Sequence, residues 1–299
     1  MSPAADASIV SLPWPVRLFG DLQEPFGLPA VEAAVELRTV IRAVPRADGR
    51  FSIAAQGLDE PILLEPGSDT DYAALIPSLV KALEVIRTRK LALTSGYDFQ
   101  VASQVKGLHN LLGSPIATTA WIVALTALAG AEEQYSGNEL ADLAAEAFTG
   151  DWSEAWGRPE LDAAILGGLI CVETLGEAGP RPLNRDLPSL ILGGLKESDL
   201  ATQAASIEET AAAIKQLEAL TGRPLRDVPF DDAVGKLQDL PDDRARIAYA
   251  HLMIRDRCRV ACELLDGEIG FDDDRLGELM DGTHEVMRDL LDRNHEPLE

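Results

Sequence analysis

The sequence lacks any long apolar run and has little positive charge. No stretch approaches the ~20 consecutive apolar residues that a membrane-spanning helix needs. Its 26 Lys and Arg residues stand against 50 Asp and Glu residues, which gives a net charge of −24. Such acidity argues against binding to nucleic acid or to an anionic membrane surface. We therefore expect a solvated acidic surface, no nucleic-acid partner and no membrane partner.

Cysteine and histidine are also scarce. Cys171, Cys258 and Cys262 are an odd number without metal-ligand spacing, so we interpret them as buried thiols in a reducing compartment. The four histidines form no ligand pair at close spacing. The first residues show no basic start followed by an apolar core, the pattern of a signal peptide. These absences favour a cytoplasmic protein.

The 299 residues suffice for one large domain or two ordinary ones, and 46% of them are hydrophobic. Periodicity predicts strands and helices along the whole chain. The expected strands are a hairpin over 38–53 that turns at 47–49, a short strand at 62–64 and a strand over 95–103. The expected helices cover 72–89, 117–129, 139–148, 208–220 and 245–265. Residues before Ser11 are expected to be disordered.

One stretch near the start, residues 15–37, carries the clearest functional signal. An apolar run from Val16 to Phe19 predicts a strand, and Gly20 ends it. A loop then carries the acids Asp21 and Glu24, and a segment rich in Ala and Val follows. The residues alone indicate a strand, an acidic loop and a return segment.

This stretch resembles the first motif of the GHMP small-molecule kinases, in their galactokinase-like branch. Leu18-Phe19-Gly20 and residues 27–31, Gly-Leu-Pro-Ala-Val, match that motif well. The acidic loop matches it in outline, with Asp21 in place of Glu and Glu24 in place of Asp. The resemblance implies that Asp21 and Glu24 bind the substrate.

A second match lies at residues 107–120, where the family has a glycine-rich loop before an apolar helix. In the family, free amides at that helix N-terminus hold the nucleotide phosphates. The resemblance implies nucleotide-binding roles for Gly113, Ser114, Thr118 and Thr119. However, Pro115 removes one amide donor. Ser114 as N-cap before Pro115 is a sufficient structural explanation, and we favour it over tight ATP binding.

Two further acids match family positions. Glu146 follows Ala145 as a magnesium-binding Glu does in the family, although a solvated helix glutamate is the commoner meaning. Asp162, before Gly167-Gly168, falls on the catalytic aspartate of the family. A helix start there would also favour an acid, through the helix dipole.

The stretch 275–289 closely resembles a galactokinase segment, but no counterpart of the glycine-rich third motif follows. The resemblance implies an α+β fold in two lobes: residues 1–180 as the N-terminal domain and 181–299 as an incomplete ferredoxin-like C-terminal domain. An incomplete layer should expose an apolar sheet face. We expect a homo-oligomer, or a helix from 245–265 or 275–291, to cover it. We read the arginines along 245–265 as part of a mixed solvated surface.

The implied function is ATP- and Mg²⁺-dependent phosphorylation of a small sugar-like molecule, with Asp162 acting on the substrate hydroxyl. The first two motifs match the family only in part, so an alternative remains. That alternative is a catalytically inactive relative that binds a sugar or regulates another protein.

Overall fold

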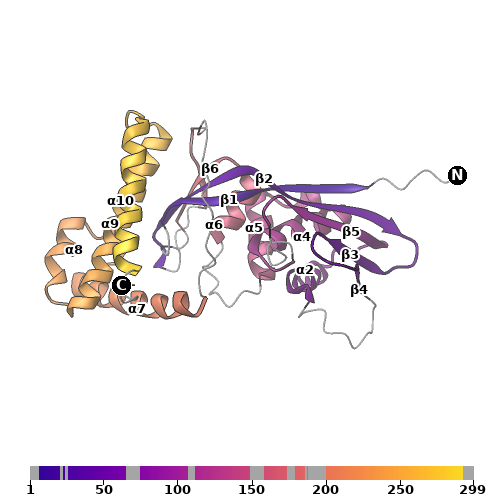
Figure 1. The fold of residues 1–299 in the computed structure, drawn as a ribbon, viewed down its shortest axis with the longest axis horizontal. Coiled ribbons are helices and arrows are strands. Elements are labelled where there is room, and N and C mark those ends of the chain that lie inside the picture. Colours follow the sequence, from indigo (N-terminus) through magenta and orange to yellow (C-terminus); the bar gives the residue numbers. More distant parts are fainter. Residues whose placement is uncertain are drawn as a thin grey trace. The chain divides into compact units, whose positions relative to one another are not determined.

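The computed structural model describes residues 7–20, 23, 26–64, 75–106, 112–148, 158–173, 179–185, 187 and 200–291 (Figure 1). The chain divides into two compact units. The first contains residues 1–16 and 33–168, and the second contains residues 17–32 and 169–299. Our assignment of the two kinase-like domains to 1–180 and 181–299 stays a prediction.

Four strands come first in the described residues of this part of the chain, then one helix, a fifth strand and a run of helices. The end of the first strand and the start of the second fall within residues 17–32, which belong to the second unit. The strands are β1 (Ser8–Phe19), β2 (Pro29–Arg46), β3 (Phe51–Ala55), β4 (Ile62–Leu64) and β5 (Gly96–Ser103). The helices are α2 (Pro77–Thr88), α4 (Pro115–Leu128), η2 (Glu132–Gln134), α5 (Gly137–Ala147) and α6 (Arg158–Leu166). The expectation of disorder before Ser11 is wrong for residues 8–10, which belong to β1.

The sheet of the first unit is mixed, in the order β4-β3-β5-β2, with β1 paired to β2. Strands β2 and β5 run antiparallel from Thr39↔Ser103 to Arg46↔Gly96, whereas β3 and β5 are parallel. Our prediction of a hairpin over 38–53 is therefore wrong, because β5 lies between β2 and β3. The turn at 47–49 forms, but its two strands do not pair with each other.

The core of this unit lies between the sheet and its helices. Trp121 of α4 is fully buried and meets Phe99 of β5 edge-on, with ring centroids 5.0 Å apart. The inward faces of α2 and α5 add Leu79, Ile86 and Leu143 to the same core. The strands expected at residues 16–19 and 95–103 thus belong to one sheet, and the helix expected over 117–129 packs on it.

The second unit is mainly helical in its described part. It holds two short strands and five helical segments: β6 (Leu169–Glu173), β7 (Arg181–Pro182), α7 (Leu200–Thr221), η3 (Leu225–Asp227), α8 (Phe230–Leu237), α9 (Asp242–Asp266) and α10 (Asp273–Leu291). Helix α9 packs against α7, α8 and α10. Residues 189–194 form an apolar run that predicts a strand, and they lie outside the described residues.

Two arginines of α9, Arg255 and Arg257, bind backbone carbonyls of neighbouring segments. Arg255 is 1% exposed; it donates to the carbonyls of Leu225 and Val228 and pairs with Asp256 at 2.6 Å. Arg257 donates to the carbonyl of Gly282. Our interpretation of these arginines as solvated is wrong for Arg255, because backbone carbonyls and a carboxylate compensate its buried charge.

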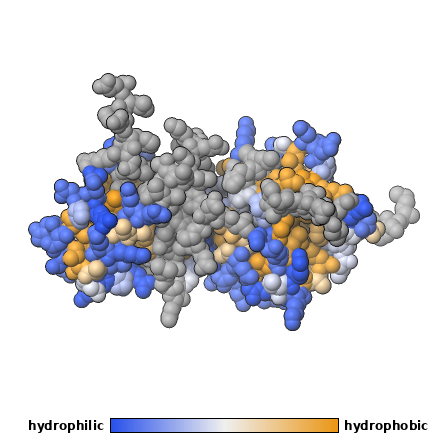
Figure 2. Space-filling view, turned by 90° about the horizontal axis from the view of Figure 1, so that it is seen from below, coloured by the Kyte–Doolittle hydropathy of each residue, from blue (hydrophilic) through white to orange (hydrophobic). Residues whose placement is uncertain are grey.

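On the face shown in Figure 2, hydrophilic side chains surround apolar ones in both units, and the apolar area is broader in the first unit. Large side chains such as Ile9, Leu75 and Tyr249 are more than one-third exposed. Within the described ranges, no helix combines the length and apolarity needed to cross a membrane. The mixture of helices and a mixed sheet confirms the predicted α+β class.

Candidate functional site

Asp162 is the buried acid at the centre of the candidate site. It lies on α6 with 1% exposure, and the Nε of Arg158 contacts both of its carboxylate oxygens, at 2.9 and 3.0 Å. Arg158 stands one helical turn earlier, so the pair has the i,i+4 spacing that brings side chains together on a helix. Nη1 of the same Arg158 lies 2.5 Å from a carboxylate oxygen of Asp142 on α5. One arginine thus bridges a buried and an exposed carboxylate.

Burial and pairing act in opposite directions on these groups. Burial raises the pKa of Asp162 above its ordinary value, and the contact with Arg158 only partly offsets this. Burial alone would lower the pKa of Arg158, but pairing with Asp162 and Asp142 raises it. The result is an aspartate whose proton affinity exceeds that of a solvated carboxylate, beside a fixed positive charge.

The structure changes the alternative explanation that we gave for Asp162. We expected Asp162 to begin a helix, where the dipole alone would favour an acid. That expectation is wrong, because α6 already runs from Arg158 and Asp162 is its fifth residue. The dipole acts mainly within the first turn. The competing explanation is now a buried ion pair that stabilises the fold.

The start of α4 has the capping chemistry that we favoured. The Ser114 side chain accepts from the amide of Ala117 at 3.1 Å, and Pro115 occupies the first helical position. The hydroxyls of Thr118 and Thr119 donate to the carbonyls of Ser114 and Pro115. These hydrogen bonds use the hydroxyl donors that a phosphate would need. Residues 107–111 of the matched loop lie outside the described residues.

Glu146, the candidate magnesium ligand, forms a surface ion pair in the first unit. Its carboxylate lies 2.5 Å from Arg89, and both side chains are nearly half exposed. Within the described part of the chain, no three His, Cys, Asp or Glu side chains gather as a metal site would require. Helices α4, α5 and α6 pack against one another, so Glu146, Asp162 and the start of α4 stand on neighbouring helices.

Asp21 and Glu24, the candidate substrate ligands, lie outside the described residues, but Gln23 between them is described. Its Nε2 lies 2.8 Å from Nδ1 of His251, and both side chains are fully buried in the second unit. Phe26 meets the His251 ring edge-on, with centroids 5.7 Å apart. Burial lowers the pKa of His251 to about 4, so the ring is neutral at pH 7.

Sequence reasoning missed the partners Arg158 and Gln23. The i,i+4 spacing of Arg158 and Asp162 was a readable signal for the first. Nothing in the sequence could indicate the second, because Gln23 and His251 are 228 residues apart.

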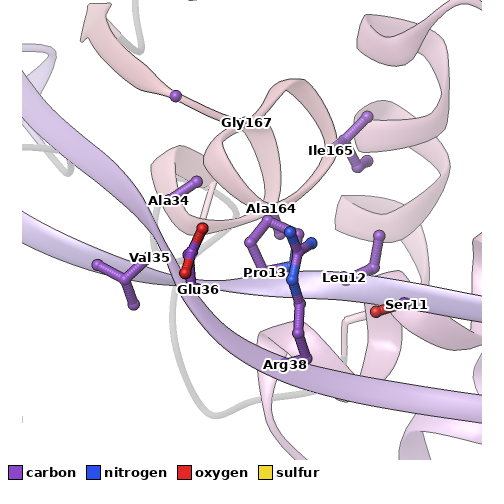
Figure 3. Close-up of a pocket in the computed structure, with 11 residues that line it drawn as sticks. Ser11, Leu12, Pro13, Ala34, Val35, Glu36, Arg38, Ala164, Ile165 and Gly167 are labelled. Atoms are coloured by element: carbon purple, nitrogen blue, oxygen red, sulfur yellow. The ribbon is translucent and has the colours of Figure 1, made fainter. Parts of the chain in front are cut away.

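A hollow of about 410 Å³ lies beside the end of α6 in the first unit (Figure 3). Strands β1 and β2 line one side, and Ala164, Gly167 and Gly168 line the other. Glu36 and Arg38 project from β2 on the same side, as expected for residues two apart in a strand. Asp162 is not among the residues that line this hollow.

Comparison with known proteins gives sequence relatives but no matching protein-family model. The mevalonate kinase of Pyrococcus horikoshii is 32% identical over 143 residues, covering 45% of this chain and 42% of that protein. The mevalonate kinase of Thermococcus sibiricus is 30% identical over 132 residues, covering 42% of this chain and 40% of that protein. The matched segment thus spans less than half the length of these relatives.

Solved structures match nearly the whole chain. The Lactococcus lactis galactokinase complexed with galactose has a TM-score of 0.67 at 13% identity, covering 96% of this chain and 76% of that chain. The Methanococcus jannaschii mevalonate kinase has a TM-score of 0.60 at 15% identity, covering 96% of this chain and 80% of that chain. The matched segments resemble mevalonate kinases, and the whole chain has the fold of these mevalonate kinase and galactokinase structures.

Proposed function

We propose that this chain is a GHMP-type kinase that transfers a phosphoryl group from ATP to a hydroxyl of a small molecule. The observation that carries the proposal is the buried Asp162 held by Arg158. The motif resemblance aligns Asp162 with the family's catalytic aspartate. A carboxylate with a raised pKa is a better proton acceptor than a solvated one at neutral pH.

In this proposal Asp162 accepts the proton of the attacking hydroxyl, or orients that hydroxyl. Arg158 contacts both oxygens of Asp162 and so fixes the plane of the carboxylate. Each oxygen retains lone pairs that could accept from a substrate. Because Asp162 is 1% exposed, the substrate reaches it only if the packing around α6 opens.

ATP would supply the phosphoryl group, and Gly113, Ser114, Thr118 and Thr119 remain the proposed nucleotide-binding residues. The described residues fit a nucleotide weakly, because the cap and both threonine hydroxyls are used within α4. They also fit Mg²⁺ poorly, because Glu146 pairs with Arg89. We therefore predict an ATP Kd above ~10 μM, about −7 kcal/mol, which still lies within the usual range of KM values.

The proposed substrate is a small polyhydroxylated or hydroxy-acid compound, which Asp21 and Glu24 would bind. The motif resemblance favours a sugar, whereas the sequence relatives are mevalonate kinases. A panel of hexoses, heptoses and mevalonate, each assayed for substrate-dependent release of ADP from Mg-ATP, tests the proposal. Turnover with any member supports it, and absence of turnover with all of them overturns it.

The second candidate is a non-catalytic binding protein. The threonine hydroxyls at the start of α4 favour it, because they already donate to carbonyls of the same helix. The two candidates differ in what they do with nucleotide. Calorimetry with Mg-ATP should show measurable binding for the kinase. A protein that binds galactose or mevalonate but not Mg-ATP at millimolar concentration would be the inactive relative.

A further inference from the structure

Three thiols that have no part in the proposed function lie together in the second unit. Cys171 of β6 and Cys262 of α9 are in contact, with their sulfur atoms 2.7 Å apart, although they are 91 residues apart in sequence. Cys258 stands one helical turn before Cys262 on α9 and also hydrogen-bonds with it. All three are buried, as the sequence predicted.

We propose that Cys171 and Cys262 are a thiol oxidation site, which a peroxide converts into a disulfide that joins β6 to α9. Protein disulfides require Cβ atoms about 3.5–4.5 Å apart. The direct contact of the two sulfurs places this pair close to that requirement. The two thiols come from different elements, so a bond between them does not require a helical turn to unwind.

Cys258 is not expected to take part in the disulfide. Residues four apart on a helix have Cβ atoms roughly 5–6 Å apart, which is too far for a disulfide unless the helix unwinds. A bond between Cys258 and Cys262 would therefore break a buried turn of α9. The cross-link should be specific for Cys171 with Cys262, and Cys258 should remain reduced.

The chemistry balances with one peroxide per disulfide. Cys171 is the most exposed of the three at 7%, so its sulfur attacks the peroxide, breaking the O–O bond and giving a sulfenic acid and water. The sulfur of Cys262 then attacks the sulfenic sulfur, forming the S–S bond and releasing a second water. The two thiols lose two electrons, and hydrogen peroxide is reduced to two waters.

Burial should make this reaction slow rather than absent. The hydrogen bond with Cys171 lowers the pKa of Cys262, but the hydrogen bond with Cys258 and burial together raise it well above its ordinary value. A small oxidant such as hydrogen peroxide suits a buried pair better than a bulky disulfide does.

The test uses the reduced full chain treated with stoichiometric hydrogen peroxide, followed by intact mass, thiol titration after denaturation and peptide mapping. We expect a mass loss of about 2 Da, loss of two of the three thiols and a Cys171–Cys262 peptide pair, all reversed by dithiothreitol. The cross-linked form should also have a higher Tm, because the bond closes a long loop.

Matched variants sharpen the test. Cys258→Ser should form the disulfide like the natural chain, whereas Cys171→Ser and Cys262→Ser should not form it. Mapping of the natural chain identifies the pair even if a variant fails to fold. A natural chain that keeps three thiols, or a cross-link that includes Cys258, overturns the proposal.

Discussion

At the scale of single residues, the buried polar side chains need a physical explanation. Asp162, Arg255 and His251 are each at most 1% exposed, and each meets a polar partner. Such groups persist only when partners compensate for lost hydration. Backbone carbonyls compensate the buried charge of Arg255, which indicates a structural role. Asp162 and His251 instead contact side chains that lie within the matched motifs, Arg158 and Gln23.

His251 leads to a prediction about pH. Its pKa is about 4 in the folded protein against 6.5 when unfolded, so below pH 6.5 the unfolded state binds more protons. The free energy of unfolding should therefore fall as pH decreases, with His251 contributing a loss of about 2 kcal/mol between pH 7 and pH 5. Urea denaturation at both pH values measures this change.

The comparison that isolates His251 uses His251→Gln, which cannot gain a proton but can still hydrogen-bond with Gln23. This variant should lose less stability on acidification than the natural chain. His284→Gln, at an exposed position, is the control and should behave like the natural chain. Equal losses in the natural chain and His251→Gln would show that His251 does not titrate as predicted.

At the scale of elements, the turn from β1 to β2 depends on Gly20. Its φ is +89°, and a Cβ there would lie 2.5 Å from the carbonyl oxygen of Pro29. Arg17 and Glu32 pair across the same turn at 2.6 Å. A close backbone approach and an ion pair therefore stabilise the described part of the first motif.

Gly20→Ala should destabilise the protein by more than ~2 kcal/mol, because the left-handed backbone costs ~1–2 kcal/mol and the clash adds to it. Gly49→Ala is the matched control: its φ is +72°, but its Cβ would meet nothing within 4 Å. Chemical denaturation should show a clearly larger loss for Gly20→Ala. Similar losses would mean that the turn relaxes around the new methyl group.

The start of α4 gives another element-scale prediction. Ser114→Ala removes the cap on Ala117 and should cost ~1 kcal/mol of stability. If capping is the main role of Ser114, the ATP Kd should remain above ~10 μM in both proteins. Calorimetry that finds tighter binding in the natural chain, lost in Ser114→Ala, would show that this helix start is a phosphate site.

Elements with a local signal were predictable, and those with distant partners were not. Ser114 and Pro115 marked the start of α4 because capping depends on a few adjacent residues. The hairpin over 38–53 failed because its turn forms while β5, more than 40 residues later, takes the place between the strands. The same limit hid the partnership of Gln23 with His251, whereas that of Asp162 with Arg158 was local and could have been read.

At the scale of the whole molecule, the fold and the chemistry agree only in part. The chain has the GHMP kinase fold over nearly its full length. Its described residues keep a buried Asp162, but they use the α4 donors and Glu146 for structural contacts. Because phosphoryl transfer depends mainly on positioning and charge stabilisation, such losses should lower the rate more than they affect stability.

Asp162→Asn, assayed with Mg-ATP and the best substrate of the panel, tests the central claim most directly. Turnover should fall at least ~100-fold, because general-base catalysis is lost. Stability should change little, because Arg158 is partly exposed and keeps its contact with Asp142, so that no buried charge is left unpaired. Asp142→Asn, which alters the exposed contact of the same Arg158, should stay near the natural rate. Full activity in Asp162→Asn would contradict the assignment of Asp162 as the base.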